Sequence, residues 1–398
     1  MRAAPGGAFC TSTWEEVVQR EAAGVRMPAG SLVALRLHFP DAVRIQGWTM
    51  EAAGTQLVPR EWQLDHLDDD HVVIEVAGCG ICRGDIDVLA GGASPAHSLP
   101  LALGHEVAGT VVDAGPDATT WLAHQVVVPT VIPCGRCEHC RAEDEQSCLR
   151  PLRVGCDTHG GFASHVVLPA RGLCAVDSAE LSRSGVALAD LAVLAEAVSA
   201  PYQAITRSRL HAGEVAVIVG ANDIGGFAVQ IAAVLDAYVI ALDSSDRALD
   251  RAGPLGAAWT MNVHRKPPAD VRRAVLEHAR ARNLPACNWK IFECTDTVEG
   301  QQLAFELMTV GSVLSLVGQR CSDPVPVRLG QLAALDATAV GVSVHTAEHV
   351  LSALDLIVAG DIAIEPLVER RPLGAVNETL RELREGTLLR RPILVPVN

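Results

Sequence analysis

The chain has 398 residues, and its 32 Lys and Arg against 47 Asp and Glu give a formal charge of −15. Hydrophobic residues make up 49% and aromatic residues 4%, so Ala, Val and Leu can build a large core, which excludes intrinsic disorder. The length allows roughly two to four domains. The acidic balance, without a dense Lys/Arg cluster, argues against nucleic-acid binding.

Residues 1–43 show no clear periodicity, and we interpret them as an extension of unknown role with a partial helix over 14–23. Their first residues, MRAAPGGAFCTSTWEE, lack the long apolar core of a signal peptide. The richest apolar window, 215–242, is interrupted by amide and acidic side chains, so no transmembrane helix is predicted. We therefore expect a soluble, cytoplasmic protein with no membrane partner.

The stretch from 45 to about 200 is rich in Val, Gly and Pro. It contains the short alternating runs HVVIEVAG (71–78), HEVAGTVVDAG (105–115) and ASHVVLP (163–169), separated by turn signals. Short strands at this spacing favour an antiparallel, barrel-like domain.

Twelve cysteines are too few for a disulfide scaffold of this length, and clustered cysteines are then better explained as metal ligands. Four of them form a C-x2-C-x2-C-x7-C pattern: Cys134, Cys137, Cys140 and Cys148. This spacing suits a structural zinc. An iron–sulfur cluster also takes four cysteines, but the long last spacing and the lack of a following proline disfavour it. We expect small core residues at Cys156, Cys174, Cys287, Cys294 and Cys321.

A second candidate metal site combines Cys82 of a Cys-x-x-Cys pair, His105 and Glu106 after a glycine, and Glu196 far downstream. A thiolate, an imidazole and a carboxylate suit a catalytic zinc, which keeps one position for water or substrate. Glu196 lies in an apolar segment, where a buried carboxylate needs a partner such as a metal. A redox pair at the cysteines and a turn role for the histidine are the alternatives that the spacing leaves open.

The character of the sequence changes after residue 200. Buried strands are predicted at 214–220, 238–243, 289–295 and 311–318, and helices at 224–237, 347–358 and 373–384. Strand, helix and strand in this order predict a doubly wound parallel α/β domain. The chain closes with the strand-like RRPILVPV.

The first strand of this region runs into Gly220-Ala-Asn222-Asp-Ile224-Gly225-Gly226. The segment matches G-x-G-x-x-G, except that Asn222 replaces the middle glycine; asparagine tolerates positive φ, and we expect it there. Asp243 ends the next strand, where a carboxylate binds the ribose hydroxyls and repels a 2′-phosphate. These residues predict binding of NAD rather than NADP. The alternative makes the glycines packing residues and Asp243 a helix cap.

In chain order, CGICRGD, LGHEVAGTVVDAG, the four-cysteine loop, GGFASHVV and the dinucleotide motif resemble the zinc-dependent medium-chain alcohol dehydrogenases. The resemblance implies a GroES-like β-rich catalytic domain at 44–198, completed by 345–398, and a Rossmann doubly wound NAD-binding domain at 199–344. It also implies that Cys82, His105 and Glu196 hold the catalytic zinc. Glu106 would then be a neighbouring or alternate ligand. Arg391 would reach the cofactor pyrophosphate, and the chain would form a homodimer or homotetramer.

One departure from the family concerns the proton route. Members usually carry Ser or Thr two residues after the cysteine ligand and often histidine three residues further on; this chain has Gly84 and Asp87. Asp87, a water beside Gly84, or His97 are the remaining routes for the alcohol proton. Arg83 suits contact with an anionic substrate or a cofactor phosphate, or simply a solvated surface position.

The sequence therefore predicts a zinc-dependent, NAD-linked dehydrogenase that oxidises a secondary alcohol to a ketone. Longer strings, among them VIPCGRCEHC and NWKIFEC, resemble a branch of the family that acts on cyclic alcohols carried as CoA thioesters. Two alternatives stay open. Loss of the hydroxyl at Gly84 favours a zinc-dependent hydratase or lyase acting on a conjugated enoyl substrate. The other is an ene-reductase that has lost its catalytic zinc.

Overall fold

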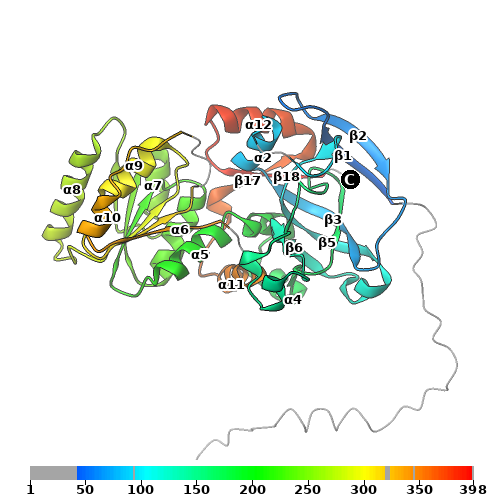
Figure 1. The fold of residues 1–398 in the computed structure, drawn as a ribbon, viewed down its shortest axis with the longest axis horizontal. Helices are drawn as coiled ribbons and strands as arrows, with labels where there is room; N and C mark the ends of the chain where they lie inside the picture. Colours follow the sequence, from blue (N-terminus) through cyan, green and yellow to red (C-terminus); the bar gives the residue numbers. More distant parts are fainter. Residues whose placement is uncertain (1–42, 93–94, 319–322, 344–345, 397–398) are drawn as a thin grey trace, which may run out of the picture. The chain divides into compact units, whose positions relative to one another are not determined.

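The computed structural model describes residues 43–92, 95–318, 323–343 and 346–396 (Figure 1). The helix predicted over 14–23 and Cys321 lie outside these ranges. Within them, none of the helices combines the length and the apolar character needed to cross a membrane.

The Val-rich first half of the chain builds antiparallel sheets. The strands are β1 (Arg44–Met50), β2 (Val58–Gln63), β3 (His71–Gly80), β4 (Leu101–Ala102), β5 (Glu106–Ala114), β6 (Gln125–Val128), β7 (Val131–Ile132), β8 (Leu152–Arg153), β9 (His165–Pro169) and β10 (Cys174–Val176). Three of them, β3, β5 and β9, confirm the predicted strands. One sheet has the order β2-β1-β4 and a larger one runs β10-β6-β5-β3, with β9 also paired to β3.

The last strands of the chain return to this larger sheet. β17 (Val368–Pro372) and β18 (Arg391–Val395) extend it as β3-β18-β17, and β18 pairs antiparallel with β3. In Figure 1 the red C-terminal strands accordingly lie beside the first-half strands. Because β3 also pairs with β5, with Gly80 opposite Glu106, the sheet brings Glu106 close to the start of β18.

The second half forms a parallel sheet. Its strands are β11 (Val215–Val219), β12 (Tyr238–Asp243), β13 (Trp259–Asn262), β14 (Lys290–Glu293), β15 (Val313–Leu316) and β16 (Thr338–Gly341). Their order is β13-β12-β11-β14-β15-β16. All five residues of β11 are buried, as expected for a parallel strand covered on both faces. The chain order reverses between β11 and β14, and ligands of doubly wound folds bind at the carboxyl ends of the strands at such a point.

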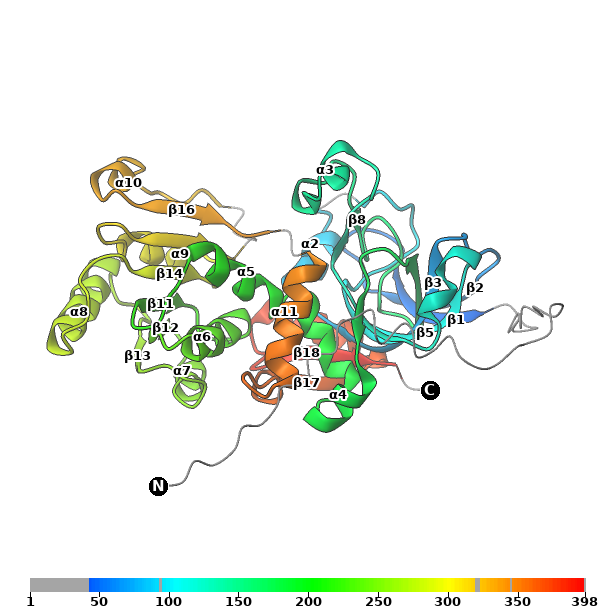
Figure 2. The same ribbon diagram turned by 90° about the horizontal axis from the view of Figure 1, so that it is seen from below.

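Helices flank this sheet and connect the two halves (Figure 2). They are α5 (Ser199–Ser208), α6 (Ile224–Val234), α7 (Asp246–Ala252), α8 (Pro268–Ala281), α9 (Val298–Glu306), α10 (Gly330–Ala334) and α11 (Ala347–Val358). Shorter or separate helices are α2 (Arg83–Leu89), α3 (Glu138–Arg141), α4 (Ser178–Ser184), α12 (Val376–Glu385) and the 3-10 segments η1 (Pro116–Trp121), η2 (Glu145–Ser147), η3 (Leu188–Ala195), η4 (Glu365–Leu367) and η5 (Leu373–Ala375). The helix predicted over 373–384 is thus confirmed, with a 3-10 first turn.

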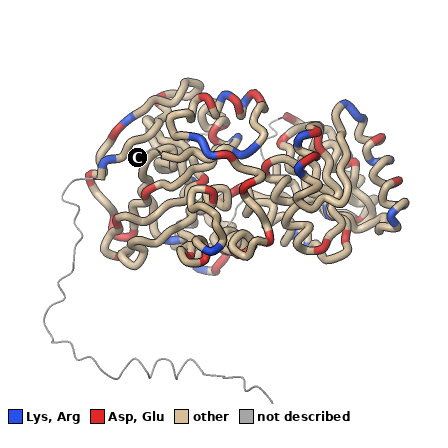
Figure 3. The backbone as a smooth tube through the Cα atoms, turned by 180° about the vertical axis from the view of Figure 1, so that it is seen from behind, with Lys and Arg blue, Asp and Glu red and all other residues tan. Residues whose placement is uncertain are grey.

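One apolar cluster is common to both sheets. It contains Ala108 of β5, Leu191 of η3, Phe227 of α6 and Ile393 of β18, all fully buried. The first-half sheet and the parallel sheet therefore share a continuous core around η3, although the predicted domain borders themselves stay predictions. Figure 3 shows acidic and basic residues interspersed along the described backbone.

The glycine at the start of α6 allows the helix to approach β11 closely. A Cβ at Gly225 would lie 1.7 Å from the carbonyl oxygen of Gly220. Gly253, after α7, has a φ of −57° and no atom within 4 Å of such a Cβ. The two glycines form a matched pair for substitution.

We expect Gly225→Ala to lower the free energy of unfolding by ~1–3 kcal/mol or more, because the backbone at Gly220 must shift away from the added Cβ. Gly253→Ala should be neutral or stabilise by up to ~1 kcal/mol, because alanine restricts the unfolded chain. Urea denaturation midpoints measure both. Equal midpoints for the two variants would contradict this close packing.

Candidate active site

The four-cysteine loop lies between β7 and β8 and carries α3 (Figure 2). Its sulfur atoms converge: Cys137 Sγ lies 3.4 Å from Cys140 Sγ and 4.0 Å from Cys148 Sγ, and Cys134 Sγ lies 3.9 Å from Cys140 Sγ. Zinc–sulfur bonds of ~2.3 Å in a tetrahedron separate sulfurs by about 3.8 Å. Backbone hydrogen bonds, that of Cys140 first, lower the pKa of Cys137 to about 6, whereas burial raises the pKa of Cys140 to about 12. The loop fits the predicted structural zinc.

Three separate elements bring the second predicted donor set together. Cys82 caps the N-terminus of α2, His105 directly precedes β5, and Glu196 ends η3. His105 Nε2 lies 3.1 Å from Cys82 Sγ and 3.1 Å from Glu196 Oε2. With a carboxylate oxygen of Glu106, these donor atoms lie within 4.8 Å of one another. The set offers the mixed thiolate, imidazole and carboxylate donors of a catalytic zinc.

Burial sets the protonation of this cluster. It raises the pKa of the Cys82 thiol to about 12, so the metal-free thiol holds its proton at neutral pH. It also raises the pKa of Glu106 to about 7, against the opposing effect of Arg391. Because metal ligands must be deprotonated, a cation that binds Cys82 has to displace its proton.

Asp85 supports the cluster and was missed by the sequence analysis. Its carboxylate accepts hydrogen bonds from the backbone N–H groups of Cys82, at 3.0 Å, and Gly104, at 3.2 Å. The same carboxylate lies 3.3 Å from His105 Nδ1 and is buried. A carboxylate on the outer nitrogen orients a ligating histidine and raises its basicity. The available signal was the capping-box spacing, Cys82 followed three residues later by an acid.

Arg391, at the start of β18, connects this cluster to the glycine-rich loop, residues 220–226. Its side chain is 2% exposed. It forms an ion pair with Glu106 through Nε and Nη2, and it contacts both carboxylate oxygens of Asp223 through Nη1 at 2.8 and 2.9 Å. Glu196 Oε2 lies 3.6 Å from Nη2. The guanidinium therefore faces three carboxylates.

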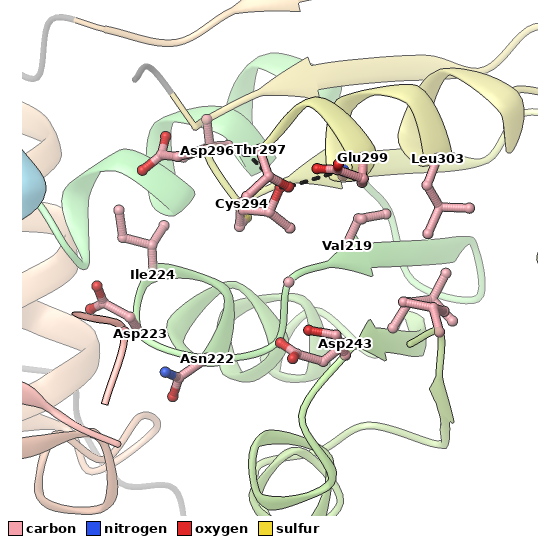
Figure 4. Close-up of a pocket in the computed structure, with 18 of the residues that line it drawn as sticks. Val219, Asn222, Asp223, Ile224, Asp243, Cys294, Asp296, Thr297, Glu299 and Leu303 are labelled. Atoms are coloured by element: carbon pink, nitrogen blue, oxygen red, sulfur yellow. Dashed lines mark hydrogen bonds between the residues drawn. The ribbon is translucent and has the colours of Figure 1, made fainter. Parts of the chain in front are cut away.

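A cavity of about 620 Å³ opens at the carboxyl ends of β11, β12 and β14 (Figure 4). Cys82 and Glu196 line it together with most of the predicted dinucleotide residues: Gly220, Asn222, Ile224, Asp243 and Arg391. Gly225 is not among the lining residues; its backbone N–H donates a hydrogen bond to the Asn222 carbonyl within the loop. Asp243 accepts hydrogen bonds from the backbone N–H groups of Ala221 and Ser245. A volume of this size is typical of a cofactor or ligand site.

The glycine-rich loop departs from the prediction at one residue. Asp223, and not Asn222, has the positive φ, with φ 50° and ψ −119°. The Asn222 carbonyl accepts a hydrogen bond from Gly225 N–H at 2.9 Å, which closes a tight turn with Asp223 in its first central position. Those angles are close to a type II′ turn, which glycine, asparagine and aspartate favour. The positive-φ prediction for Asn222 was wrong because aspartate serves equally well one position later.

The residues predicted for the proton route and for anion contact lie in different places. Arg83 and Gly84 line the cavity, whereas Asp87 and His97 are not among its lining residues. His97 instead lies against the His159 ring, with centroids 4.5 Å apart.

Of the cysteines expected in the core, Cys156 and Cys174 are buried, as predicted. Cys287 is exposed, so its prediction was wrong; the residue lies in the short connection between α8 and β14 and not in a buried strand or helix. Cys294 is partly buried and lines the cavity, because it directly follows the carboxyl end of β14.

Comparison with known proteins identifies the family. Residues 68–178 match the alcohol dehydrogenase GroES-like domain, and residues 224–359 match the zinc-binding dehydrogenase domain. An alcohol dehydrogenase of Geobacillus stearothermophilus is 26% identical, over 84% of this chain and 94% of that protein. The chain belongs to the zinc-dependent medium-chain alcohol dehydrogenases, a family of NAD(P)-dependent oxidoreductases.

Solved structures show the same fold. An alcohol dehydrogenase from Thermotoga maritima superposes with a TM-score of 0.78 at 24% identity, covering 89% of this chain and 100% of that one. A zinc-binding dehydrogenase from Sinorhizobium meliloti, bound to NADP, gives a TM-score of 0.76 at 22% identity, covering 89% and 100%. The predicted GroES-like and Rossmann architecture is confirmed.

The position of Asp85 predicts how it acts on metal binding. We expect Asp85→Asn to weaken zinc affinity by ~10–100-fold, because His105 loses the carboxylate that orients it. Asp87→Asn, the same change on the same helix, should leave the affinity unchanged within about two-fold. Competition with a chelator measures zinc affinity, and circular dichroism checks folding. Similar affinities for both variants would contradict the role assigned to Asp85.

Proposed function

We propose that the protein oxidises a secondary alcohol to a ketone, with NAD as the hydride acceptor and a zinc ion held by Cys82, His105 and Glu196. The observation that carries the proposal is the shared cavity: Cys82 and Glu196 line the same space as Gly220 and Asp243. Bound zinc would polarise the substrate hydroxyl, and bound NAD would accept the hydride. Juxtaposed metal and dinucleotide sites are what such a transfer requires.

The residues of this chain prepare that transfer. Asp85 orients His105, and the burial of Cys82 with the partial burial of His105 and Glu196 limits screening of the site's charges by water. Arg391 links Glu106, beside the metal cluster, to Asp223 of the glycine-rich loop. Arg83 lines the cavity and, with Arg391, supplies positive charge for the cofactor pyrophosphate.

The proposal also covers the group that takes up the alcohol proton and the kind of alcohol that is oxidised. Gly84 lines the cavity without a hydroxyl, so a water beside Gly84 takes the proton in this proposal, while Asp87 stays a predicted relay. Strings such as GGFASHVVLPARGLC and AVSAPYQA resemble 6-hydroxycyclohex-1-ene-1-carbonyl-CoA dehydrogenase. That likeness favours a cyclic alcohol, carried as a CoA thioester, as the substrate.

The missing hydroxyl also favours a second candidate, a zinc-dependent hydratase acting on a conjugated enoyl thioester. Both candidates use the same zinc, and they differ in whether NAD is reduced. The reductase without catalytic zinc receives no support, because the donor atoms of Cys82, His105 and Glu196 converge.

The activity is tested with purified protein, NAD and cyclic secondary alcohols, both free and as acyl-CoA derivatives. We expect NADH absorbance to rise in step with ketone. Cys82→Ser should lower the rate by about 10³-fold, since the metal loses a ligand. Cys287→Ser, at an exposed cysteine, is the matched control and should retain the wild-type rate. Hydration of an enoyl-CoA without NADH formation would favour the hydratase instead.

Asp243 predicts the choice of dinucleotide. Its carboxylate ends β12 at the cavity, where it excludes a 2′-phosphate by charge repulsion. Arg265 and Lys266 line the same cavity and supply positive charge once Asp243 is removed. We therefore expect Asp243→Ala to shift the NAD-to-NADP preference by about ten-fold or more toward NADP, measured as the ratio of the two kcat/KM values. An unchanged ratio would show that Asp243 does not select the cofactor.

The oligomeric state and the compartment belong to the same proposal. Relatives in the family suggest a homodimer or homotetramer, and we propose a cytoplasmic enzyme on the composition of the chain.

A further inference from the structure

The pyrophosphate end of the proposed cofactor site already contains an anion of the protein itself. Asp223 lies at the turn that leads into α6, where a dinucleotide phosphate meets the glycine-rich loop in this fold. Its side chain is 38% exposed, and it lines the cavity (Figure 4). Nevertheless its carboxylate accepts no capping hydrogen bond from the backbone N–H groups of α6.

The carboxylate pairs with Arg391 instead, and it does so on one particular nitrogen. Both oxygens of Asp223 contact Nη1, at 2.8 and 2.9 Å. The other two nitrogens, Nε and Nη2, are engaged by Glu106, which is fully buried. A phosphate that approaches from the cavity therefore meets Arg391 at Nη1, the nitrogen that Asp223 covers.

We propose that Asp223 is an internal competitor for the cofactor pyrophosphate and thereby sets a low affinity for the dinucleotide. The inference rests on the proposed use of this cavity for NAD. To bind, the dinucleotide must displace the Asp223 carboxylate from Arg391, and the displaced carboxylate then stays close to the incoming phosphates. The carboxylate and the phosphates are both negative and repel each other at close range. Both the displacement of Asp223 from Arg391 and this repulsion therefore weaken dinucleotide binding.

The local backbone explains why aspartate is accommodated there. The φ of 50° at residue 223 suits glycine, asparagine or aspartate. Asp223→Asn therefore keeps the turn and removes the charge. Arg391 retains Glu106 as its ion-pair partner in this variant.

A carboxylate elsewhere in the cavity provides the matched control. Asp296 lines the same cavity from the segment after β14 and, in Figure 4, projects from the wall opposite the loop that carries Asp223. Asp296→Asn removes the same charge from the same cavity. It separates an effect of the overall cavity charge from the specific competition at Arg391.

The test is isothermal titration of the zinc-loaded full chain with NADH, ADP-ribose and adenosine. We expect Asp223→Asn to tighten NADH and ADP-ribose by about ten-fold, which corresponds to about 1.4 kcal/mol. Adenosine, which has no phosphate, should bind as it does to the wild type. Asp296→Asn should change all three affinities by less than about two-fold.

The outcomes distinguish this inference from the proposed function. If the wild type binds ADP-ribose and Asp223→Asn binds it equally or more weakly, Asp223 is no competitor, while the dinucleotide site stands. Equal tightening by Asp223→Asn and Asp296→Asn would likewise overturn the inference, since it would reflect overall charge alone. If neither the wild type nor any variant binds NADH or ADP-ribose at millimolar concentration, the proposed function fails and the inference fails with it.

Discussion

The buried guanidinium of Arg391 is the interaction on which the arrangement of the site depends. It lies on the last strand of the chain, and its partners come from β5, from the end of η3 and from the loop before α6. A buried charge is costly unless it is paired and hydrogen-bonded. The return of β18 to the first-half sheet therefore sets the position of the glycine-rich loop relative to the metal donors. Alcohol oxidation by hydride transfer requires that relative position.

The same network of ion pairs couples the charges of the metal cluster to those of the glycine-rich loop. Glu106 is shared between the proposed metal site and Arg391, and Arg391 is shared between Glu106 and Asp223. The positive charge of Arg391 is balanced by Glu106 at the metal cluster and by Asp223 at the glycine-rich loop, so the charge of one site is balanced partly by residues of the other. Binding of a cation or of an anionic cofactor changes this balance, and we infer that the two ligands are energetically coupled through Arg391.

Much of the fold followed from local patterns. Alternation and turn residues predicted β3, β5 and β9, and continuous apolar runs predicted the parallel strands β11 and β12, because these features depend on burial of neighbouring residues. The cysteine spacing similarly predicted a convergent loop. What the sequence did not reveal depends on contacts between distant segments. Asp85 is a supporting residue only once His105 is beside it, and the partners of Arg391 are 168 and 285 residues away.

If both donor clusters bind zinc, one ion lies in the four-cysteine loop and the other beside the dinucleotide cavity. Elemental mass spectrometry of protein prepared without chelator measures both. We expect one zinc for each of the two clusters in the wild type. Cys140→Ser should lose one zinc and His105→Ala the other. Zinc that disappears completely in Cys140→Ser and is unchanged in His105→Ala would show that Cys82, His105 and Glu196 hold no catalytic ion.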